Sequence, residues 1–286
     1  MVTIGIIATP LGYLIHWIYE LVSNYGVAII LFTVIIKIIL APFGVSQQKM
    51  SVKLSQIQPL INDINKKYKN DKEKLSTATM ELYKKYDINP MSGCLPLLLQ
   101  FPILIGLYSV IQQPLTYILR LPADVISQKL APLGEAAANN RTGEILAAAK
   151  EGLINFNFLG MDLSQTPNFR EPSLLWIIPI IATLVTFLTP YVTKKLNGTP
   201  QGGDANNSMM NSMNVVMPVM TLFITFTLPA GIGLYWFVSS ALSIVQQILL
   251  TLYFKKKYVI DISDAVKAGK KKKSSTTSTK QLPPLN

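Results

Sequence analysis

The sequence predicts an all-α integral membrane protein with five transmembrane helices, and three observations lead to this prediction. Half of the 286 residues are hydrophobic and only 14% are charged, which is typical of a chain embedded in lipid. Long apolar segments recur along the chain, and a helix that spans a membrane needs about 20 such residues. Lysines gather in alternate connections between these segments, as in multi-pass membrane proteins.

The five expected spans lie at about 26–43, 92–113, 174–193, 211–228 and 231–254. Together they make a core of residues 26–254. The fourth apolar run is short, so its polar end at Asn211 is expected to reach the lipid headgroups. Pro229 and Gly231 then make a tight turn into the fifth span. An odd number of spans places the two termini on opposite sides of the membrane.

The distribution of charge predicts the orientation of the chain. The connection 44–90 holds nine lysines and the segment after Phe254 holds nine more, whereas the loop 120–171 has five basic residues against six acidic ones. An excess of Lys and Arg marks cytoplasmic connections. The loop 120–171 and the N-terminus are therefore expected outside, and the basic tail 255–286, expected to be largely disordered, in the cytoplasm.

Residues 1–25 are expected to form an amphipathic helix at the outer interface, because Tyr13, Trp17 and Tyr19 suit that depth. His16 is the only histidine. No second histidine and no cluster of cysteines lies beside it, so a metal site is not expected. The first ten residues carry no Lys or Arg, so no cleavable signal is expected. Cys94 is expected to be a small core residue.

A cytoplasmic helical hairpin is expected at 46–88, with one arm at 46–69 and the other at 72–86. Its arms carry apolar residues at helical spacing. They are Ile57, Leu60, Ile61 and Ile64 on the first arm and Leu75, Met80, Leu82 and Tyr83 on the second. The hairpin is either a solvated spacer or a docking arm for a partner or for lipid headgroups. In the outer loop, the alanine-rich stretch 134–152 is expected to form one surface helix.

Lys37 is the only charged side chain inside the five expected spans. A charge at the centre of a transmembrane helix costs about 2.5 to 3.5 kcal/mol on insertion scales, so it is expected to face a watery cavity or a partner. The alternative is that Lys37 extends along the helix to the headgroups, about 9 Å away near Phe43. Thr33 lies one turn earlier on the same face.

Further polar residues lie at the depth of the spans, namely Gln100, Thr183, Thr186, Gln246 and Gln247. Each alone is typical of a hydrogen bond between helices. Together with Lys37 they predict a hydrophilic pocket within the membrane. Since no acidic residue lies in any expected span, this pocket would attract a carboxylate supplied by another molecule.

Four stretches resemble the YidC/Oxa/Alb family, in order from about Tyr19 to Phe254. They are IILAPF, the run QQKMSVKLSQIQPLINDINKKYKNDKEKLSTATMELYKKYDINPMSGCLPLLLQFPILIGLY, FNFLGMDL, and LPAGIGLYWFVSSALSIVQQ. The resemblance implies a five-helix core around a positively charged groove, in the cell membrane of a bacterium. This groove opens to the cytoplasm and to lipid, and it is closed toward the outside.

The resemblance also implies a function: insertion and folding of nascent membrane proteins without nucleotide hydrolysis, alone or beside the Sec translocon. By position, Lys37 supplies the groove charge, Thr33 lines the same wall, and Trp236 lies on the path of the substrate helix. Gln100, Thr183, Thr186 and Gln246 are expected to line the groove. The hairpin would recruit partners and the basic tail would contact the ribosome or anionic lipids. No cofactor, metal or catalytic residue is expected.

One departure from the family pattern concerns the groove charge, which is usually arginine and is lysine here. A guanidinium can hold a carboxylate through two hydrogen bonds, whereas an ammonium is a point charge. The large outer domain of some relatives is also not found. Rival interpretations are a small-molecule or ion transporter that uses the Lys37 pocket, an intramembrane enzyme, and a scaffold without a groove. No nucleotide-binding loop of the G-x-x-x-x-G-K-[ST] type occurs.

Overall fold

The computed structural model describes residues 2–89, 95–134, 143–168, 170–197 and 204–258. Cys94 and the tail from residue 259 onward lie outside these ranges. The chain divides into two compact units. Unit 1 comprises Met1–Gly44, Cys94–Val192 and Asn214–Gln246, and unit 2 comprises Val45–Gly93, Thr193–Met213 and Gln247–Asn286.

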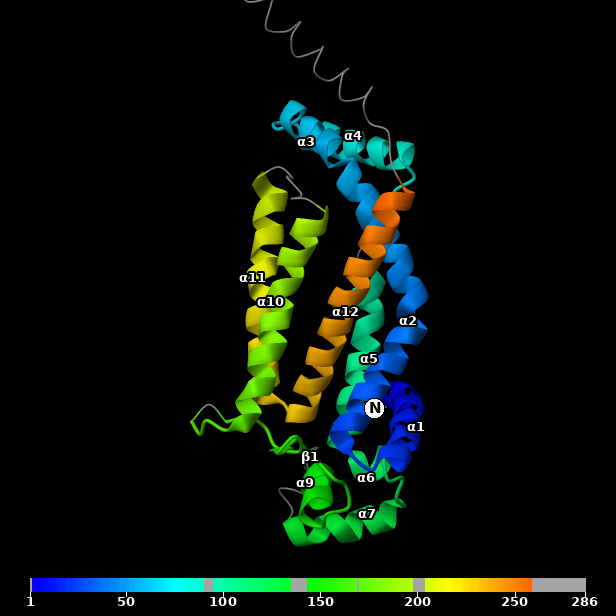
Figure 1. The fold of residues 1–286 in the computed structure, drawn as a ribbon, viewed down its shortest axis with the longest axis vertical. Helices are drawn as coiled ribbons and strands as arrows, with labels where there is room; N and C mark the ends of the chain where they lie inside the picture. The colour runs from blue at the N-terminus through cyan, green and yellow to red at the C-terminus, as the bar shows by residue number, and fades with distance from the viewer. Residues whose placement is uncertain (1, 90–94, 135–142, 169, 198–203, 259–286) are drawn as a thin grey trace, which may run out of the picture. The chain divides into compact units, whose positions relative to one another are not determined.

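Six long helices dominate the structure (Figure 1). They are α1 (Val2–Val22), α2 (Tyr25–Gln56), α5 (Leu95–Gln112), α10 (Ile177–Asn197), α11 (Asp204–Thr227) and α12 (Ala230–Lys257). Among the described residues, four segments are long and apolar enough to cross a membrane: Gly5–Val22, Tyr25–Gln56, Leu174–Leu196 and Ala230–Lys257. Shorter apolar helices cover Gln100–Gln112 and Val215–Thr227. The prediction of an all-α membrane protein is confirmed at this level. The count of five spans stays a prediction.

Helix α2 extends well beyond the expected end of the first span at residue 43. Pro42 lies inside it, and the residues that follow favour a helix, so the helix continues to Gln56. It ends there, and Pro59 lies in the first turn of the next helix, a position where its missing N–H costs no hydrogen bond. The segment 46–56, expected in the hairpin, therefore belongs to α2.

In unit 1, α1 packs against α5 and buries one of its faces. Ala8 and Ile15 are fully buried, whereas Trp17 is 69% and Leu21 is 83% exposed. Both the buried and the exposed side of α1 therefore carry apolar side chains, and its expected amphipathic character stays a prediction. Because α1 also has the length and composition of a span, its expected place at the outer interface stays a prediction.

The first half of α12 contacts several helices of unit 1 through two glycines. A Cβ on Gly231 would lie 3.0 Å from Cε1 of Tyr25 on α2. A Cβ on Gly233 would lie 2.8 Å from Cγ2 of Ile178 on α10 and 3.7 Å from Cβ of Thr225 on α11. Glycine permits these approaches because it has no side chain, and the start of α12 is therefore fixed against three neighbours.

The loop 120–171 and the residues on either side of it contain short elements of unit 1 (Figure 1). They are α6 (Pro114–Tyr117), α7 (Ala123–Leu130), the 3-10 helix η2 (Ala131–Leu133), α9 (Gly143–Lys150), the antiparallel strands β1 (Asn157–Phe158) and β2 (Met161–Asp162), and the 3-10 helix η3 (Leu174–Trp176). Helix α9 contacts α5, α6 and α7, and its Ile145 and Ala148 are buried. Residues 135–142 of the surface helix expected over 134–152 lie outside the described residues. In the described part the prediction of a surface helix is wrong, because the small alanine side chains let α9 pack closely against its neighbours.

In unit 2, the expected hairpin segment contains α3 (Gln58–Lys67) and α4 (Lys72–Lys85), which contact each other. Asp71 caps α4 by accepting a hydrogen bond from the backbone N–H of Lys74 at 3.0 Å. The hydrogen bond from the Lys74 side chain, with that from its backbone, holds the pKa of Asp71 below its usual value.

The apolar stripe of this segment is partly as expected. Ile57 and Ile61 are buried in a small core with Ile88, against which Leu82 packs. Met80, however, is 47% exposed, so its expected place on the stripe is wrong. At about 100° per residue, a position two residues from Leu82 lies on the opposite side of the helix.

Candidate functional site

Lys37 lies within α2 and is bonded to α12 inside unit 1. Its Nζ donates a hydrogen bond to Oγ of Ser243 at 2.8 Å, and its side chain is half-buried. No Asp or Glu oxygen lies within 4.0 Å of this ammonium among the described residues. A serine hydroxyl on α12 is therefore its polar partner.

Polar groups of the protein lie on both sides of Lys37 along this face of α2. Thr33 is 1% exposed, and its hydroxyl donates to the carbonyl oxygen of Ile29 at 2.6 Å. Two turns beyond Lys37 is Gly44, and Nε2 of Gln246 occupies the space that a Cβ would take there. This face of α2 thus meets polar side chains of α12 at two levels.

The opposing face of α12 is a stripe that we call the α12 polar stripe: Tyr235, Ser239, Ser243 and Gln246. The spacings of four, four and three residues place them on one side of the helix. The Ser243 hydroxyl donates to the carbonyl oxygen of Ser239 at 2.8 Å. Only Gln246 of this set was expected from the sequence, although the helical spacing of the other three was visible there.

Gln100 joins α5 to the same stripe. Its Nε2 donates to the hydroxyl oxygen of Tyr235 at 2.6 Å, and the tyrosine is 2% exposed. Three helices of unit 1 therefore place polar groups against one another: α2 through Lys37, α5 through Gln100, and α12 through its stripe. The bond between Gln100 and Tyr235 joins residues 135 positions apart in sequence, and the bond between Lys37 and Ser243 joins residues 206 positions apart.

The other expected site residues are not joined to Lys37 by any hydrogen bond within the described part of the chain. Thr186 donates to the carbonyl oxygen of Ala182 on its own helix α10 at 2.9 Å. The buried hydroxyl of Thr183 has no hydrogen-bond partner among the described residues. Trp236 is half-buried on α12. Gln247 belongs to unit 2, where its Nε2 donates to the Thr193 hydroxyl at 2.7 Å.

The chemistry of this site suits an anionic or strongly polar group. A lysine ammonium has three N–H donors, and Ser243 accepts one of them. Hydroxyl and amide groups nearby supply further donors and acceptors. Among the described residues of the five expected spans there is no Asp or Glu, so a carboxylate at Lys37 would have to come from outside these spans.

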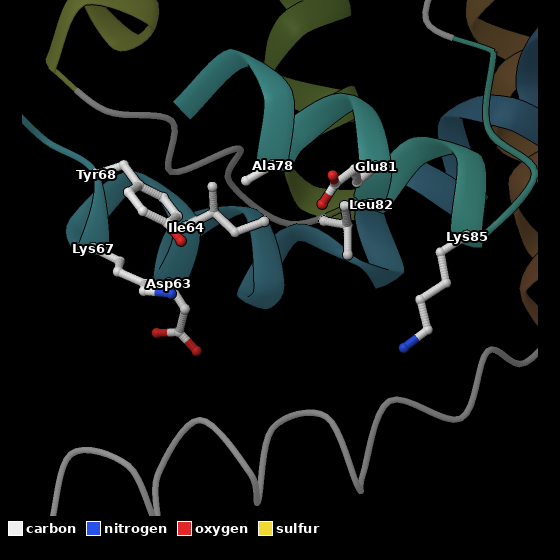
Figure 2. Close-up of a pocket in the computed structure, with 8 residues that line it drawn as sticks. All are labelled: Asp63, Ile64, Lys67, Tyr68, Ala78, Glu81, Leu82 and Lys85. Atoms are coloured by element: carbon white, nitrogen blue, oxygen red, sulfur yellow. The ribbon is translucent and has the colours of Figure 1, made fainter. Parts of the chain in front are cut away.

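A second candidate site lies between α3 and α4 in unit 2. Figure 2 shows the eight side chains that line a pocket of about 360 Å³, with Ile64, Leu82 and Ala78 between the helices and charged groups of both signs around them. The lining residues are Asp63, Ile64, Lys67, Tyr68, Ala78, Glu81, Leu82 and Lys85. An apolar floor with a charged rim is typical of a surface that docks a protein segment.

Two ionisable side chains outside the Lys37 site, His16 and Glu144, form hydrogen bonds with neighbouring residues. Nδ1 of His16 lies 2.6 Å from the carbonyl oxygen of Ile118. Glu144 on α9 is 7% exposed, and its carboxyl oxygens accept from the N–H and the hydroxyl of Thr116 at 2.8 and 2.7 Å. Burial raises the pKa of Glu144, and the Thr116 hydrogen bonds act in the opposite direction. Over the described residues, no three His, Cys, Asp or Glu side chains gather as a metal site would require.

The fold and the site define a membrane protein built mainly of helices, with polar side chains and the Lys37 ammonium between its apolar helices. The pattern of the family described as "60Kd inner membrane protein" matches residues 17–257. This chain belongs to that family, which is the YidC/Oxa family, and the resemblance read from its sequence motifs is confirmed.

Several relatives carry the name membrane protein insertase. The protein named "Membrane protein insertase YidC" of Caldanaerobacter subterraneus subsp. tengcongensis is 36% identical over 242 residues, which is 84% of this chain and 92% of the relative. Its namesake in Fusobacterium nucleatum subsp. nucleatum is 32% identical, over 83% of this chain and 91% of the relative. "Membrane protein insertase YidC 2" of Listeria innocua is 32% identical, over 88% and 72%.

Proposed function

We propose that this protein is a membrane protein insertase, which moves hydrophobic segments of nascent membrane proteins from the cytoplasm into the bilayer. The observation that carries the proposal is the half-buried ammonium of Lys37, bonded to Ser243 on a neighbouring helix. Membership in a family whose relatives are named insertases supports the same function. The transporter interpretation of the Lys37 pocket is not favoured, because these relatives are not named as transporters.

In the proposed mechanism, the hydrophilic and often acidic outer segment of a substrate enters a polar groove from the cytoplasmic side. Lys37, Thr33, Gln100 and Gln246 lower the cost of removing this segment from water, because a charged or polar group without partners is expensive in an apolar medium. The attraction between an ammonium and a carboxylate is strong in such surroundings. The groove therefore selects for substrates with negative charge.

The hydrophobic segment of the substrate meanwhile slides past α10 and α12 into lipid. In this proposal Thr183, Thr186 and Trp236 lie along its path. Transfer of apolar surface out of water releases about 25 cal/mol for each Å², and a segment of about 20 residues is long enough to span the bilayer. This gain suffices as a driving force, so the proposed reaction uses no nucleotide and no cofactor.

The rest of the chain is proposed to recruit substrates. The pocket between α3 and α4 (Figure 2) would dock a partner on the cytoplasmic side. The basic tail, outside the described residues, would contact the ribosome or anionic lipids, and the insertase would work alone or beside the Sec translocon. The outward N-terminus, the cytoplasmic C-terminus and the five spans belong to this proposal.

The test is reconstitution of the purified protein into liposomes, with protease protection of a small single-spanning substrate that has an acidic outer tail. Wild type, Lys37→Arg, Lys37→Ala and Lys37→Glu are compared with empty liposomes. We expect insertion by wild type and Lys37→Arg, a reduced yield with Lys37→Ala, and no insertion with Lys37→Glu.

Two results of this experiment contradict the proposal in different ways. If all four proteins insert the substrate equally, Lys37 is a lysine that reaches the headgroups, and the electrostatic mechanism is wrong. If wild type inserts no more than empty liposomes, with or without the Sec translocon in the same bilayer, the protein is not an insertase of this substrate class.

A further inference from the structure

The bond between Lys37 and Ser243 has a defined direction. A serine hydroxyl carries one proton, and in this structure Ser243 donates it to the carbonyl oxygen of Ser239 at 2.8 Å. The lone pairs of the Ser243 oxygen are therefore left to accept the Lys37 ammonium, whose Nζ lies 2.8 Å away. The backbone of α12 thus orients this hydroxyl as an acceptor for a cation.

The bond matters because a lysine side chain is flexible. Its four-carbon stem has many rotamers, and its compact ammonium is strongly hydrated. A lysine at this depth without an acceptor would extend toward water at the headgroups. Ser243 offers an acceptor on α12, while the same ammonium has no Asp or Glu oxygen within 4.0 Å among the described residues.

We propose that Ser243 is the positioning residue for Lys37, and that it makes insertion selective for substrates with acidic outer segments. It holds the ammonium beside α12 and uses one N–H donor. The other two donors then remain for a substrate carboxylate. This inference rests on the proposed insertase function and adds to it a residue that sets the substrate's charge preference.

The test uses the liposome assay with two substrates that share one hydrophobic segment. One has an acidic outer tail, and in the other Asn and Gln replace Asp and Glu. The proteins are wild type, Ser243→Ala, Ser243→Thr, Lys37→Ala and the double variant Lys37→Ala with Ser243→Ala. The matched control is Ser240→Ala, a half-buried serine on the same helix. Thermal melting of each protein confirms that it is folded.

We expect Ser243→Ala to lower the initial insertion rate of the acidic substrate by about fivefold, because a hydrogen bond to a charged group is lost at a half-buried position. The rate with the neutral tail should stay at the wild-type level. Ser243→Thr should keep the wild-type rate with the acidic substrate, since threonine also has a hydroxyl, which bonds to a preceding carbonyl oxygen in helices. In the Lys37→Ala background, Ser243→Ala should have no further effect, and Ser240→Ala should behave as wild type.

Three results overturn the inference. If Ser243→Ala matches wild type on the acidic substrate while Lys37→Ala is impaired, the proposed function stands and Ser243 does not position the lysine. If Ser243→Ala slows both substrates and still does so without Lys37, its role is structural. If wild type inserts neither substrate, the proposed function fails first, and the inference fails with it.

Discussion

The contact between Gly26 and Phe158 gives a prediction of large effect and definite sign. Gly26 lies in the first turn of α2, the helix that carries Lys37, and Phe158 lies on β1 in the FNFLGMDL stretch. A Cβ added at Gly26 would lie 2.7 Å from Cβ and 2.5 Å from Cδ2 of Phe158. Distances below 3.0 Å are not tolerated by carbon atoms, so one segment must move in a Gly26→Ala variant.

The magnitude follows from which atoms collide. The Cβ of Phe158 is fixed to its backbone, so a rotation of the ring cannot remove the clash. Overpacking of this kind costs about 1 to 3 kcal/mol. The gain of about 0.5 to 1 kcal/mol that alanine usually brings to a helix offsets only part of this cost. At about 2 to 4 °C per kcal/mol, the melting temperature should fall by several degrees.

The assay is thermal unfolding of the purified protein in detergent, followed by the loss of the monodisperse peak on size exclusion. Gly5→Ala is the matched control, since it lies inside α1 and a Cβ there meets nothing within 4 Å. This control should melt at or above the wild-type temperature. The two glycine-to-alanine changes are therefore expected to have opposite effects.

A compensating change tests the cause of the effect. In a Phe158→Gly background the colliding Cβ and ring atoms are gone, so the further cost of Gly26→Ala should be much smaller than in wild type. If Gly26→Ala melts at the same temperature as Gly5→Ala, or if its cost is unchanged without the Phe158 side chain, the clash with Phe158 is not the cause of the effect.

Two further predictions concern buried polar groups. Burial raises the pKa of Glu144 from 4.5, so the protonated side chain favours the native state. The stability that this side chain contributes is present at low pH and is lost as the pH rises through the raised pKa. The melting temperature of Glu144→Gln minus that of wild type should therefore increase between about pH 4 and pH 7, and a constant difference would contradict the assignment. In unit 2, the buried Gln48 donates to the Thr251 hydroxyl at 2.7 Å. Thr251→Val should destabilise the protein by about 1 to 3 kcal/mol because the Gln48 amide loses its partner. The double variant with Gln48→Leu should lose less stability in thermal melting. A larger loss in the double variant would show that packing, and not the hydrogen bond, determines the stability at this position.

The ends of the helices show where local signals were sufficient and where they were not. The two expected arms, 46–69 and 72–86, leave a break at residues 70 and 71, and Asp71 is the residue that caps α4. The end of α2 was placed near residue 43 because hydrophobicity falls there. Hydrophobicity reports the depth of the membrane and not the end of the helix, so the extension through Pro42 to Gln56 was not found.

The structure of the loop 120–171 could not be predicted correctly from its sequence. Alanines have high helix propensity and little hydrophobic signal, so the stretch around α9 looked like a surface helix. Its burial depends on the contacts that α9 makes with α5, α6 and α7, which lie far from it in sequence. The buried carboxyl of Glu144 is likewise explained only by its two hydrogen bonds to Thr116.

The sequence alone determined the class of this protein, because hydrophobic composition, the length of apolar segments and the placement of lysines all follow from the physics of a bilayer. It also singled out Lys37, since a single charge in an apolar helix is visible without coordinates. The tertiary structure decided which groups meet that charge. Ser243 is 206 positions away in sequence, and only the packing of α12 against α2 brings its hydroxyl to the ammonium.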